Sequence, residues 1–248
     1  MKISIITVTH NSAATIRDTL ESVGQQDYLD IEHIIVDGRS TDNTLSIINQ
    51  FPYISKILSE RDGGMYDAMN KGIALATGDI IGILNSDDVY NNNRVISKVM
   101  RAFEDKSIDA VYGDLQYVKQ EDLSKITRTW KSGSFDKSKF YYGWMPPHPS
   151  FFVRKSVYDT AGKFNTSLKT SADYEFMLRV LLKFDHKVKY LPEVFVKMRT
   201  GGASNASLAN RLKANREDKK AWAINNLKPH FFTIPLKPLR KIFQFFVK

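Results

Sequence analysis

The sequence predicts an α/β fold with a mostly parallel central sheet and helices on both of its faces. Two observations support this prediction. Strand-like and helix-like patterns alternate through the first half of the chain in the order β-α-β-α-β-α-β. The strand-like segments are also continuous apolar runs, which is typical of strands buried on both faces.

The expected elements of the first half follow from these patterns. The strands cover residues 3–8, 34–36, 56–58 and 80–84. Each of the three helices between them has an apolar face at helical spacing. The inward residues are Ile16, Leu20 and Val23, then Leu45 and Ile48, then Met65, Met69 and Ile73. Asn11 and Ser12 precede the first helix and Ser40 precedes the second, as helix-capping residues would.

The second half of the chain is less regular, and its strands are expected to be partly antiparallel. Strand-like segments occupy residues 110–113, 115–119, 127–131 and 151–154. A helix is expected over 174–182. The proline-rich segment 145–149 predicts a rigid loop, because proline fixes φ and disfavours helix in the residue before it.

Length and composition are those of a globular protein with one large domain, or with one domain and an appendage. The 248 residues are 42% hydrophobic and include no cysteine. A disulfide framework and a thiolate metal site are therefore excluded, which fits a reducing compartment. The N-terminal segment lacks the apolar run of a signal peptide, and no stretch reaches the ~18 apolar residues of a spanning helix.

Positive charge is concentrated at the C-terminal end. The net charge is +9, and residues 211–248 hold ten Lys and Arg against two acidic residues. The first 210 residues are therefore nearly neutral, and the remainder is a basic appendage that predicts an anionic partner. The candidates are nucleic acid and a membrane surface.

The last residues show the pattern of a basic amphipathic helix. Its apolar face would contain Leu236, Leu239, Ile242, Phe243, Phe246 and Val247. A continuous apolar face with basic residues beside it is typical of a helix on an anionic membrane surface, whereas binding phosphates alone needs only charge. Pro238 is expected in the first turn of this helix. The alternative is a helix that docks on its own domain.

Acidic residues follow the strand-like segments of the first half. Asp37 follows the second strand, Asp62 the third, and Asp87 and Asp88 the fourth. Ligands of open α/β sheets bind beyond the carboxyl ends of the strands, where two carboxylates can hold a divalent cation and so grip a diphosphate. A carboxylate such as Asp37 can also accept hydrogen bonds from a nucleobase or a ribose. The alternative for Asp87 and Asp88 is a solvated turn.

Five sequence blocks follow one another over roughly residues 1–200: TVTHNSA, IIVDGRSTDNT, SERDGGMYDAMNKGIALATGD, ILNSDD and SADYEFMLR. In order and spacing they resemble the inverting glycosyltransferases of family 2. The resemblance implies a GT-A fold over residues 1–210, with a nucleotide-sugar half (1–113) and an acceptor half (114–210), followed by a basic helical tail (211–248). It also implies a nucleotide-sugar donor, most often UDP-linked, with Mn²⁺ or Mg²⁺ on its diphosphate.

The same resemblance assigns roles to the matched residues. The nucleotide-sugar-binding residues would be Thr7, Thr9, Asn11, Asp37, Asp62, Lys71, Ser86 and Asp87. Asp87 and Asp88 would hold the metal, and Asp173 would be the catalytic base. The family often has an acceptor-side loop around His148, and Trp144 is expected on the acceptor side as an aromatic residue that could stack on a sugar.

This distribution suits inverting transfer, which is an in-line displacement at the anomeric carbon. One carboxylate must accept the proton of the acceptor hydroxyl on one face of the sugar. A cation must neutralise the leaving diphosphate on the other face. Two positions depart from the family pattern. Asn85 stands where the acidic motif usually begins with Asp, and Ala172 stands where Glu commonly precedes the base.

Several of these residues also have purely structural alternatives. Asp173 can be a plain helix N-cap, and His148 can be a loop histidine bonded to the backbone. One aromatic group forms either a stacking platform for a sugar or part of the core: Trp130, Tyr141, Tyr142 and Trp144. The segment 199–202 is either a glycine-rich loop near the diphosphate or an ordinary surface loop.

The predicted function is metal-dependent inverting transfer of a sugar to a saccharide or a lipid-linked saccharide, in the synthesis of a cell-surface glycan. The expected location is the cytoplasmic face of the plasma membrane, with no nucleic acid as partner. One rival is a nucleotide-sugar-forming nucleotidyltransferase, which usually has a glycine- and arginine-rich loop where this chain has THNSAA. The other is a non-enzymatic nucleic-acid-binding protein, against which the nearly neutral body argues. No GxGxxG motif occurs, which argues against a dehydrogenase.

Overall fold

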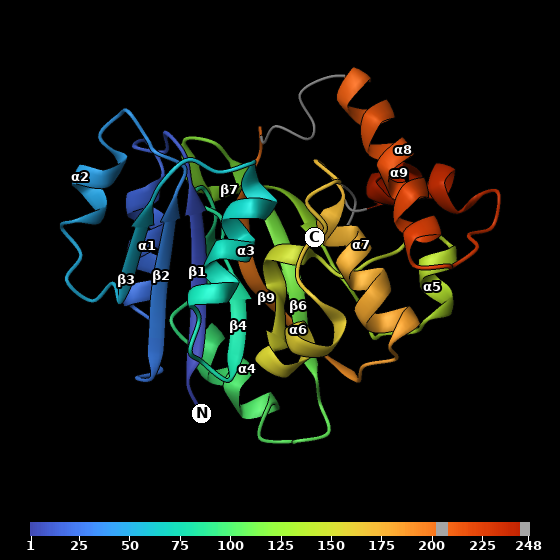
Figure 1. The fold of residues 1–248 in the computed structure, drawn as a ribbon, viewed down its shortest axis with the longest axis horizontal. Coiled ribbons are helices and arrows are strands. Elements are labelled where there is room, and N and C mark those ends of the chain that lie inside the picture. Colours follow the sequence, from blue (N-terminus) through green and yellow to red (C-terminus); the bar gives the residue numbers. More distant parts are fainter. Residues whose placement is uncertain (202–207, 244–248) are drawn as a thin grey trace.

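The first four strands of the chain form the parallel half of one mixed sheet (Figure 1). The computed structural model describes residues 1–201 and 208–243, and within them the strand order is β3-β2-β1-β4-β8-β6-β9-β5, with β7 paired to β6. Within the first group, β1 pairs in parallel with β2 and β4, and β2 with β3. These strands are β1 (Ile3–Thr9), β2 (Ile31–Asp37), β3 (Lys56–Ser59) and β4 (Ile80–Ile83). The predicted parallel order of the first half is confirmed.

Helices cover both faces of this part of the sheet, because successive side chains of a strand point to opposite faces. On β1, Ile3 and Ile5 belong to the core cluster that contains α4, whereas Ile6 and Val8 belong to the cluster that contains α3. The helices of this half are α1 (Ile16–Gly24), α2 (Thr44–Ile48), α3 (Met65–Leu75) and α4 (Val95–Ala102). The predicted mixed α/β architecture is therefore present.

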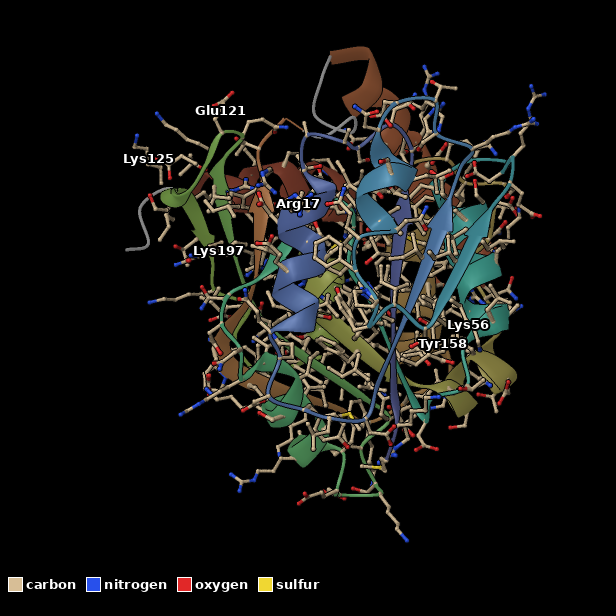
Figure 2. All side chains as sticks on the ribbon, turned by 90° about the vertical axis from the view of Figure 1, so that its left-hand side faces the viewer. Arg17, Lys56, Glu121, Lys125, Tyr158 and Lys197 are labelled. Carbon is tan, nitrogen blue, oxygen red and sulfur yellow. The ribbon has the colours of Figure 1, made fainter. Side chains whose placement is uncertain are left out.

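The second half of the sheet is partly antiparallel, as expected. β8 pairs antiparallel with β4 and β6, and β7 pairs antiparallel with β6. The β6–β7 hairpin carries Lys125 at the margin of the molecule (Figure 2). The strands are β5 (Val89–Tyr90), β6 (Ala110–Lys119), β7 (Asp122–Trp130), β8 (Phe151–Arg154) and β9 (Val188–Arg199).

Two features of these strands differ from the sequence pattern. β6 is one continuous strand rather than two, because a register irregularity near Gly113 is absorbed within its pairing to β9. β9 has twelve residues and lies parallel to β6, yet the sequence pattern did not predict it. Its residues VKYLPEVFVKMR include a proline and several charges, so no apolar run marks it.

Shorter helices surround the second half. The helix predicted over 174–182 is an α-helix that continues into a π-helical turn, and the proline-rich loop contains a 3₁₀ turn. These elements are α5 (Ser138–Tyr141), η1 (His148–Ser150), α6 (Lys155–Ala161), α7 (Ala172–Leu178), η2 (Arg179–Lys183), α8 (Leu208–Ile224) and α9 (Thr233–Phe243).

The polar residues expected to cap the first two helices have another role. α1 begins at Ile16 and α2 at Thr44, so Ser12 and Ser40 lie several residues before them. Instead they join the loops that follow β1 and β2. The backbone N–H of Asn11 donates to Ser40 Oγ at 2.8 Å, and that of Ser12 donates to Thr44 Oγ1 at 2.8 Å. The two loops therefore form one hydrogen-bonded rim at the carboxyl edge of the sheet.

The two C-terminal helices pack on the rest of the chain. Trp222 of α8 is fully buried, and its Nε1 donates to the hydroxyl of Tyr174 on α7 at 2.9 Å. Thr233 Oγ1, at the start of α9, donates to the carbonyl of Tyr141 at 2.6 Å. The helix thus docks on its own domain, which was the alternative to a free anchor. The domain boundary at residue 210 stays a prediction.

The start of α9 differs from the expectation. Because the helix begins at Thr233, Pro238 lies in its interior rather than in its first turn. Of the predicted apolar face, Phe246 and Val247 lie outside the described residues, and so do the side chains of Ile242 and Phe243. Among the described residues, no helix has the length and apolar content needed to cross a membrane.

Acid should destabilise the fold through His33, a fully buried residue of β2. Its Nε2 lies 3.0 Å from Thr7 Oγ1, and burial lowers its pKa from 6.5 to about 3. Between these values the unfolded chain binds a proton that the folded chain does not, so the free energy of unfolding falls as the pH drops below 6.5. In urea unfolding at pH 5 to 6.5, His33→Gln should reduce the pH slope by up to about 1.4 kcal/mol per unit.

The exposed His230 offers a matched control for this measurement. His230→Gln should leave the slope of the wild-type protein unchanged. Equal slopes for His33→Gln and the wild-type protein would contradict a neutral, buried His33.

Candidate active site

Asp173 lies in the first turn of α7, with its carboxylate held by two other segments. The N-cap of this helix is Ser171, so the alternative of Asp173 as a plain N-cap does not hold. Asp173 Oδ1 accepts a hydrogen bond from the hydroxyl of Tyr66 on α3 at 2.8 Å. Its Oδ2 lies 3.2 Å from Nδ1 of His148 on η1. His148 is therefore a partner of the carboxylate rather than only a loop residue.

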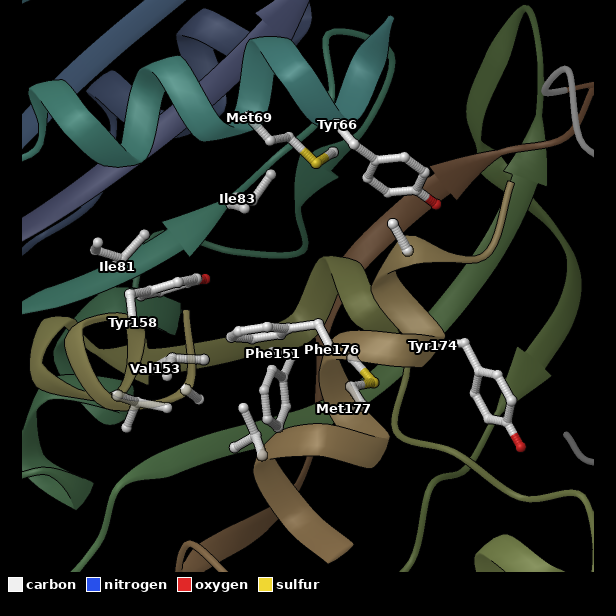
Figure 3. Close-up of a cluster of buried hydrophobic side chains, with 14 of the residues drawn as sticks. Tyr66, Met69, Ile81, Ile83, Phe151, Val153, Tyr158, Tyr174, Phe176 and Met177 are labelled. Atoms are coloured by element: carbon white, nitrogen blue, oxygen red, sulfur yellow. The ribbon is translucent and has the colours of Figure 1, made fainter. Parts of the chain in front are cut away.

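The surroundings of this carboxylate are largely apolar. A small cavity of about 20 Å³ lies against Asp173 and His148. Met69, Phe176 and Met177 also line this cavity, and Figure 3 shows the buried apolar cluster to which they and Tyr66 belong. Burial, and then the charge of Asp173, raise the pKa of Tyr66, so its hydroxyl stays a neutral donor. In apolar surroundings such a hydrogen bond to a carboxylate is strengthened.

Asp87 and Asp88 follow β4, and their side chains are partly and fully buried, respectively. Asp88 is 1% exposed, and its Oδ2 accepts a hydrogen bond from Asn85 Nδ2 at 3.3 Å. Burial raises the pKa of Asp88 well above its ordinary value, and the charge of Asp87 adds to this. Burial also raises the pKa of Asp87, and the charges of Arg199 and His148 oppose that rise. This is not the solvated turn of the alternative reading.

One oxygen of this pair and one of the neighbouring Asn85 fit a divalent cation. Asp88 Oδ1 and Asn85 Oδ1 are both buried and have no hydrogen-bond partner among the described residues. Carboxylate and amide oxygens are the ligands that hard cations take, and a buried oxygen without a partner is otherwise costly. No group of three or more His, Cys, Asp or Glu that could hold an ion occurs in the described part of the chain.

Arg199, at the end of β9, fixes the main chain of the acidic pair. It is 4% exposed, and its Nη1 donates to the carbonyl of Asp87 at 2.8 Å while Nη2 pairs with Asp18. The segment 199–202 was predicted either near the diphosphate or as a surface loop, and Gly202 lies outside the described residues. The sequence prediction included Arg199 only as part of this segment, without its bond to Asp87, and it did not include Tyr66. The only sequence signal for Tyr66 was its place inside the GGMYDAMN block.

The carboxyl edge of the sheet brings together several of the predicted nucleotide-sugar residues. Asp37 is buried and accepts hydrogen bonds from the Ser40 N–H at 3.1 Å and from Ser59 Oγ at 2.6 Å. Asp62 Oδ2 lies 2.7 Å from the position that a Cβ on Gly38 would take, so only glycine fits there without a shift. Three more predicted residues lie at this edge. Asn11 follows β1 and is exposed, while Thr9, the last residue of β1, has a buried Oγ1 without a partner among the described residues. Ser86 follows β4, and its Oγ lies 2.9 Å from Ser12 Oγ.

Two other predicted residues have side chains that are already engaged within the protein. Thr7 is fully buried against His33, so its side chain does not line a pocket. Lys71 pairs with Glu60 at 2.8 Å and donates to the carbonyl of Arg61. Its ammonium is thus already engaged within α3 and the loop before it.

Two of the four aromatic side chains predicted as a sugar platform pack into the protein instead. Trp144 is 6% exposed in the core, where its Nε1 donates to the carbonyl of Ser132 at 2.9 Å. Tyr141 packs on Trp222 with ring centroids 5.0 Å apart. The core alternative holds for both, whereas Tyr142 is 50% exposed. Ala172, the residue before Asp173, is fully buried.

Comparison with known proteins decides the family. Residues 4–161 match the family model described as Glycosyl transferase family 2. The chain belongs to glycosyltransferase family 2. A PGL/p-HBAD biosynthesis glycosyltransferase of Mycobacterium bovis is 32% identical over 208 residues, which are 82% of this chain and 78% of that protein. The chondroitin synthase of Pasteurella multocida is 30% identical over 190 residues, 74% of this chain and 19% of that larger protein. This family 2 chain is therefore a glycosyltransferase.

Solved structures agree with the predicted GT-A fold. S. aureus TarS 1–349, in complex with UDP-GlcNAc, superposes with a TM-score of 0.72 at 19% identity, over 91% of this chain and 65% of that one. The mannosyltransferase PcManGT from Pyrobaculum calidifontis, in complex with GDP-Man and Mn²⁺, gives a TM-score of 0.67 at 18% identity, over 97% and 69%. At these identities the similarity concerns the fold alone.

Because Asp88 is buried, its replacement should affect the melting temperature differently with and without ligand. In EDTA, Asp88→Asn should melt at the wild-type temperature or higher, because it removes a buried charge next to Asp87. With excess Mn²⁺ and UDP the wild-type midpoint should rise, since ligand at a hundredfold excess over Kd adds about 2.7 kcal/mol. The variant should lose that rise. The matched control is the exposed Asp159→Asn, which should keep it; a full Mn²⁺-dependent rise in Asp88→Asn would contradict the metal assignment.

Proposed function

We propose that this glycosyltransferase moves a sugar from a UDP-sugar to a hydroxyl of a saccharide or lipid-linked saccharide, with inversion and with a divalent cation. The observation that carries the proposal is the position of Asp173. Its carboxylate is held by Tyr66 at 2.8 Å and by His148 at 3.2 Å, while the acidic pair lies on a separate segment. The charge of His148 acts on Asp87 as well, which supports one site with the base and the acidic pair on two sides of it.

In this mechanism the acceptor oxygen forms a bond to the anomeric carbon while the bond from that carbon to the diphosphate breaks. The proton of the acceptor hydroxyl passes to Asp173. The hydrogen bond from Tyr66 occupies Oδ1 and orients the carboxylate, and His148 lies beside Oδ2. Holding the base in one orientation lowers the entropic part of the barrier.

Asp87 and Asp88 would hold Mn²⁺ or Mg²⁺, with Asn85 beside them. When bound, such a cation neutralises the charge that develops on the diphosphate. Arg199 keeps the Asp87 main chain in place for this role. Bound Mn²⁺ in the PcManGT complex, and the nucleotide-sugars in both structural neighbours, support the cofactor and the donor class.

The relatives also bear on the acceptor and on the rival functions. They are named for the biosynthesis of PGL/p-HBAD and of chondroitin, which supports a saccharide or lipid-linked acceptor in a surface glycan. Membership of a glycosyltransferase family favours sugar transfer over nucleotidyl transfer. The loop after β1 also differs from a glycine- and arginine-rich phosphate loop, because its Asn11 and Ser12 amides bond to the β2–α2 loop.

Replacing the proposed base should separate binding from chemistry. Asp173→Asn keeps the size of the side chain and an oxygen for the Tyr66 hydrogen bond. We expect it to keep the melting-temperature rise with UDP and Mn²⁺ and to lose about 10²- to 10⁴-fold in transfer rate, since it cannot accept a proton. Turnover is measured as UDP release from a panel of UDP-sugars with saccharide acceptors. The exposed Glu104→Gln is the control, and near-normal turnover in Asp173→Asn would remove this residue from the mechanism.

Tyr66 should act on the rate of transfer through the orientation of the base. Tyr66→Phe removes the donor to Asp173 but keeps the ring, so the carboxylate is no longer held in one orientation. A hydrogen bond to a charged group is worth roughly 1.5–3 kcal/mol, so kcat should fall by roughly 10- to 150-fold while the melting-temperature rise with UDP and Mn²⁺ is kept. An unchanged kcat would mean that Tyr66 only packs against α7.

A further inference from the structure

We infer that the outward surface of α8, α9 and their connecting loop binds an anionic phospholipid membrane. Two basic residues of α8, Arg216 and Lys219, would contact lipid phosphates, and Phe231 would insert among the acyl chains. The inference deepens the proposed function, because it places the enzyme beside a lipid-linked acceptor, and in that respect it rests on that function. It replaces the single amphipathic face expected at 236–247 with a surface built from two docked helices.

The two helices are held rigidly enough to present one surface. Lys237 of α9 pairs with Asp218 of α8 at 2.8 Å, and its ammonium lies 3.5 Å from the ring centroid of Tyr174. Gly143 has φ of +76° and approaches the α9 backbone so closely that a Cβ would lie 2.6 Å from the Lys237 nitrogen. Trp222 anchors α8 in the core. A ligand on this surface is therefore attached to the whole domain.

The outward charge of these helices is of one sign. Both acidic residues between positions 213 and 240 turn inward, where Glu217 accepts a hydrogen bond from the Thr170 N–H at 2.7 Å and Asp218 pairs with Lys237. Exposed basic residues remain on the outside: Lys213, Arg216, Lys219, Lys220, Lys228 and Arg240. Since both acidic side chains between positions 213 and 240 are buried, the outer surface of this described segment carries positive charge, and an anionic surface complements it.

A groove combines this charge with an exposed aromatic ring. It has a volume of about 460 Å³ and is lined by Arg216, Lys219, His230, Phe231 and Ile234, among others. Phe231 is 93% exposed and belongs to the α8–α9 connection. Figure 1 shows this connection at the right-hand edge of the molecule. Basic residues around an exposed aromatic are typical of proteins that lie on membranes, where the ring enters the apolar layer and the cations meet the headgroups. Nucleic-acid binding explains the charge but not a solvent-facing phenylalanine in a loop.

The helix that carries most of this surface packs along the helix that carries the proposed base. α8 packs along α7, and Glu217 of α8 also accepts a hydrogen bond from Thr170 Oγ1 at 2.8 Å. Thr170 is three residues before Asp173. An acceptor saccharide carried on a lipid would therefore reach the acceptor side of the site from the membrane on which α8 and α9 lie.

Vesicle sedimentation tests the inference with point variants, because deleting α9 would also break the Lys237–Asp218 pair. The full chain should bind vesicles that contain one third phosphatidylglycerol and should bind pure phosphatidylcholine much more weakly. Arg216→Gln/Lys219→Gln should weaken binding about thirtyfold, since each basic residue near an anionic leaflet contributes about fivefold. Phe231→Ser should weaken it about tenfold.

The matched controls lie at the far end of the molecule. Arg101→Gln/Lys106→Gln removes two exposed basic residues from α4 and the loop after it, opposite to α8 in Figure 1, and Leu29→Ser removes a side chain that is 99% exposed. Both controls should bind like the wild-type protein. Equal binding to neutral vesicles, or equal losses in test and control variants, would overturn the inference. So would tighter binding of the wild-type protein to an oligonucleotide duplex than to the anionic vesicles.

The same variants keep this test separate from the proposed function. Arg216→Gln/Lys219→Gln and Phe231→Ser should show the wild-type melting rise with UDP and Mn²⁺ and normal transfer to a soluble saccharide. Lost vesicle binding with these readouts intact supports the membrane surface. Intact transfer together with unchanged vesicle binding overturns the membrane surface alone, whereas a fully active Asp173→Asn overturns the proposed mechanism alone.

Discussion

The hydrogen bond between Tyr66 and Asp173 joins the two halves of the molecule at the point where the chemistry is proposed. Its partners are 107 residues apart in the chain and come from α3, which covers the parallel strands, and from α7, in the second half of the chain. Both helices pack against one apolar core cluster. The close packing of this core fixes the distance between the Tyr66 hydroxyl and the Asp173 carboxylate. The position of the base thus depends on the packing of the two halves rather than on a local loop.

A second constraint is the cost of placing negative charge at the edge of the sheet. Asp37 is compensated by Ser40 and Ser59, but Asp88 keeps a buried oxygen without a partner among the described residues. An uncompensated buried carboxylate lowers stability unless it is protonated or meets a cation. The raised pKa of Asp88 follows from this position. A cation bound at Asp88 would remove this cost in the folded chain. Because the unfolded chain has no such site, the bound cation would raise the free energy of unfolding.

Much of the first half was predictable because its signals are local. Apolar runs marked β1 to β4, and acidic residues at strand ends marked Asp87 and Asp88. The parts that were missed depend on long-range contacts. β9 has no apolar run and is held by its pairing with β6. The partner of Tyr66, Asp173, is 107 residues away in the chain, so the sequence around Tyr66 does not indicate their hydrogen bond. Trp144 was assigned to the acceptor side by type alone, and only packing shows that it faces the core. Residue type and spacing therefore predict which chemistry is present, but not which side chains turn toward it.

Glu217 and Asp218 turn inward and hold the C-terminal helices to the rest of the domain and to each other. Glu217 accepts a hydrogen bond from the segment before α7, and Asp218 of α8 pairs with Lys237 of α9. Each buried acidic group has partners in the protein, which removes the negative charge of α8 from its outer surface and stabilises the segment before α7. Had these two residues faced solvent, they would pair with neighbouring lysines and reduce the positive charge of the outer surface. Glu217 instead braces the segment before α7 and Asp218 holds α9, while exposed basic residues remain outside. A domain that needed only solubility would gain nothing from such an arrangement, whereas an enzyme that works on an anionic surface gains both a firm base and an attractive face.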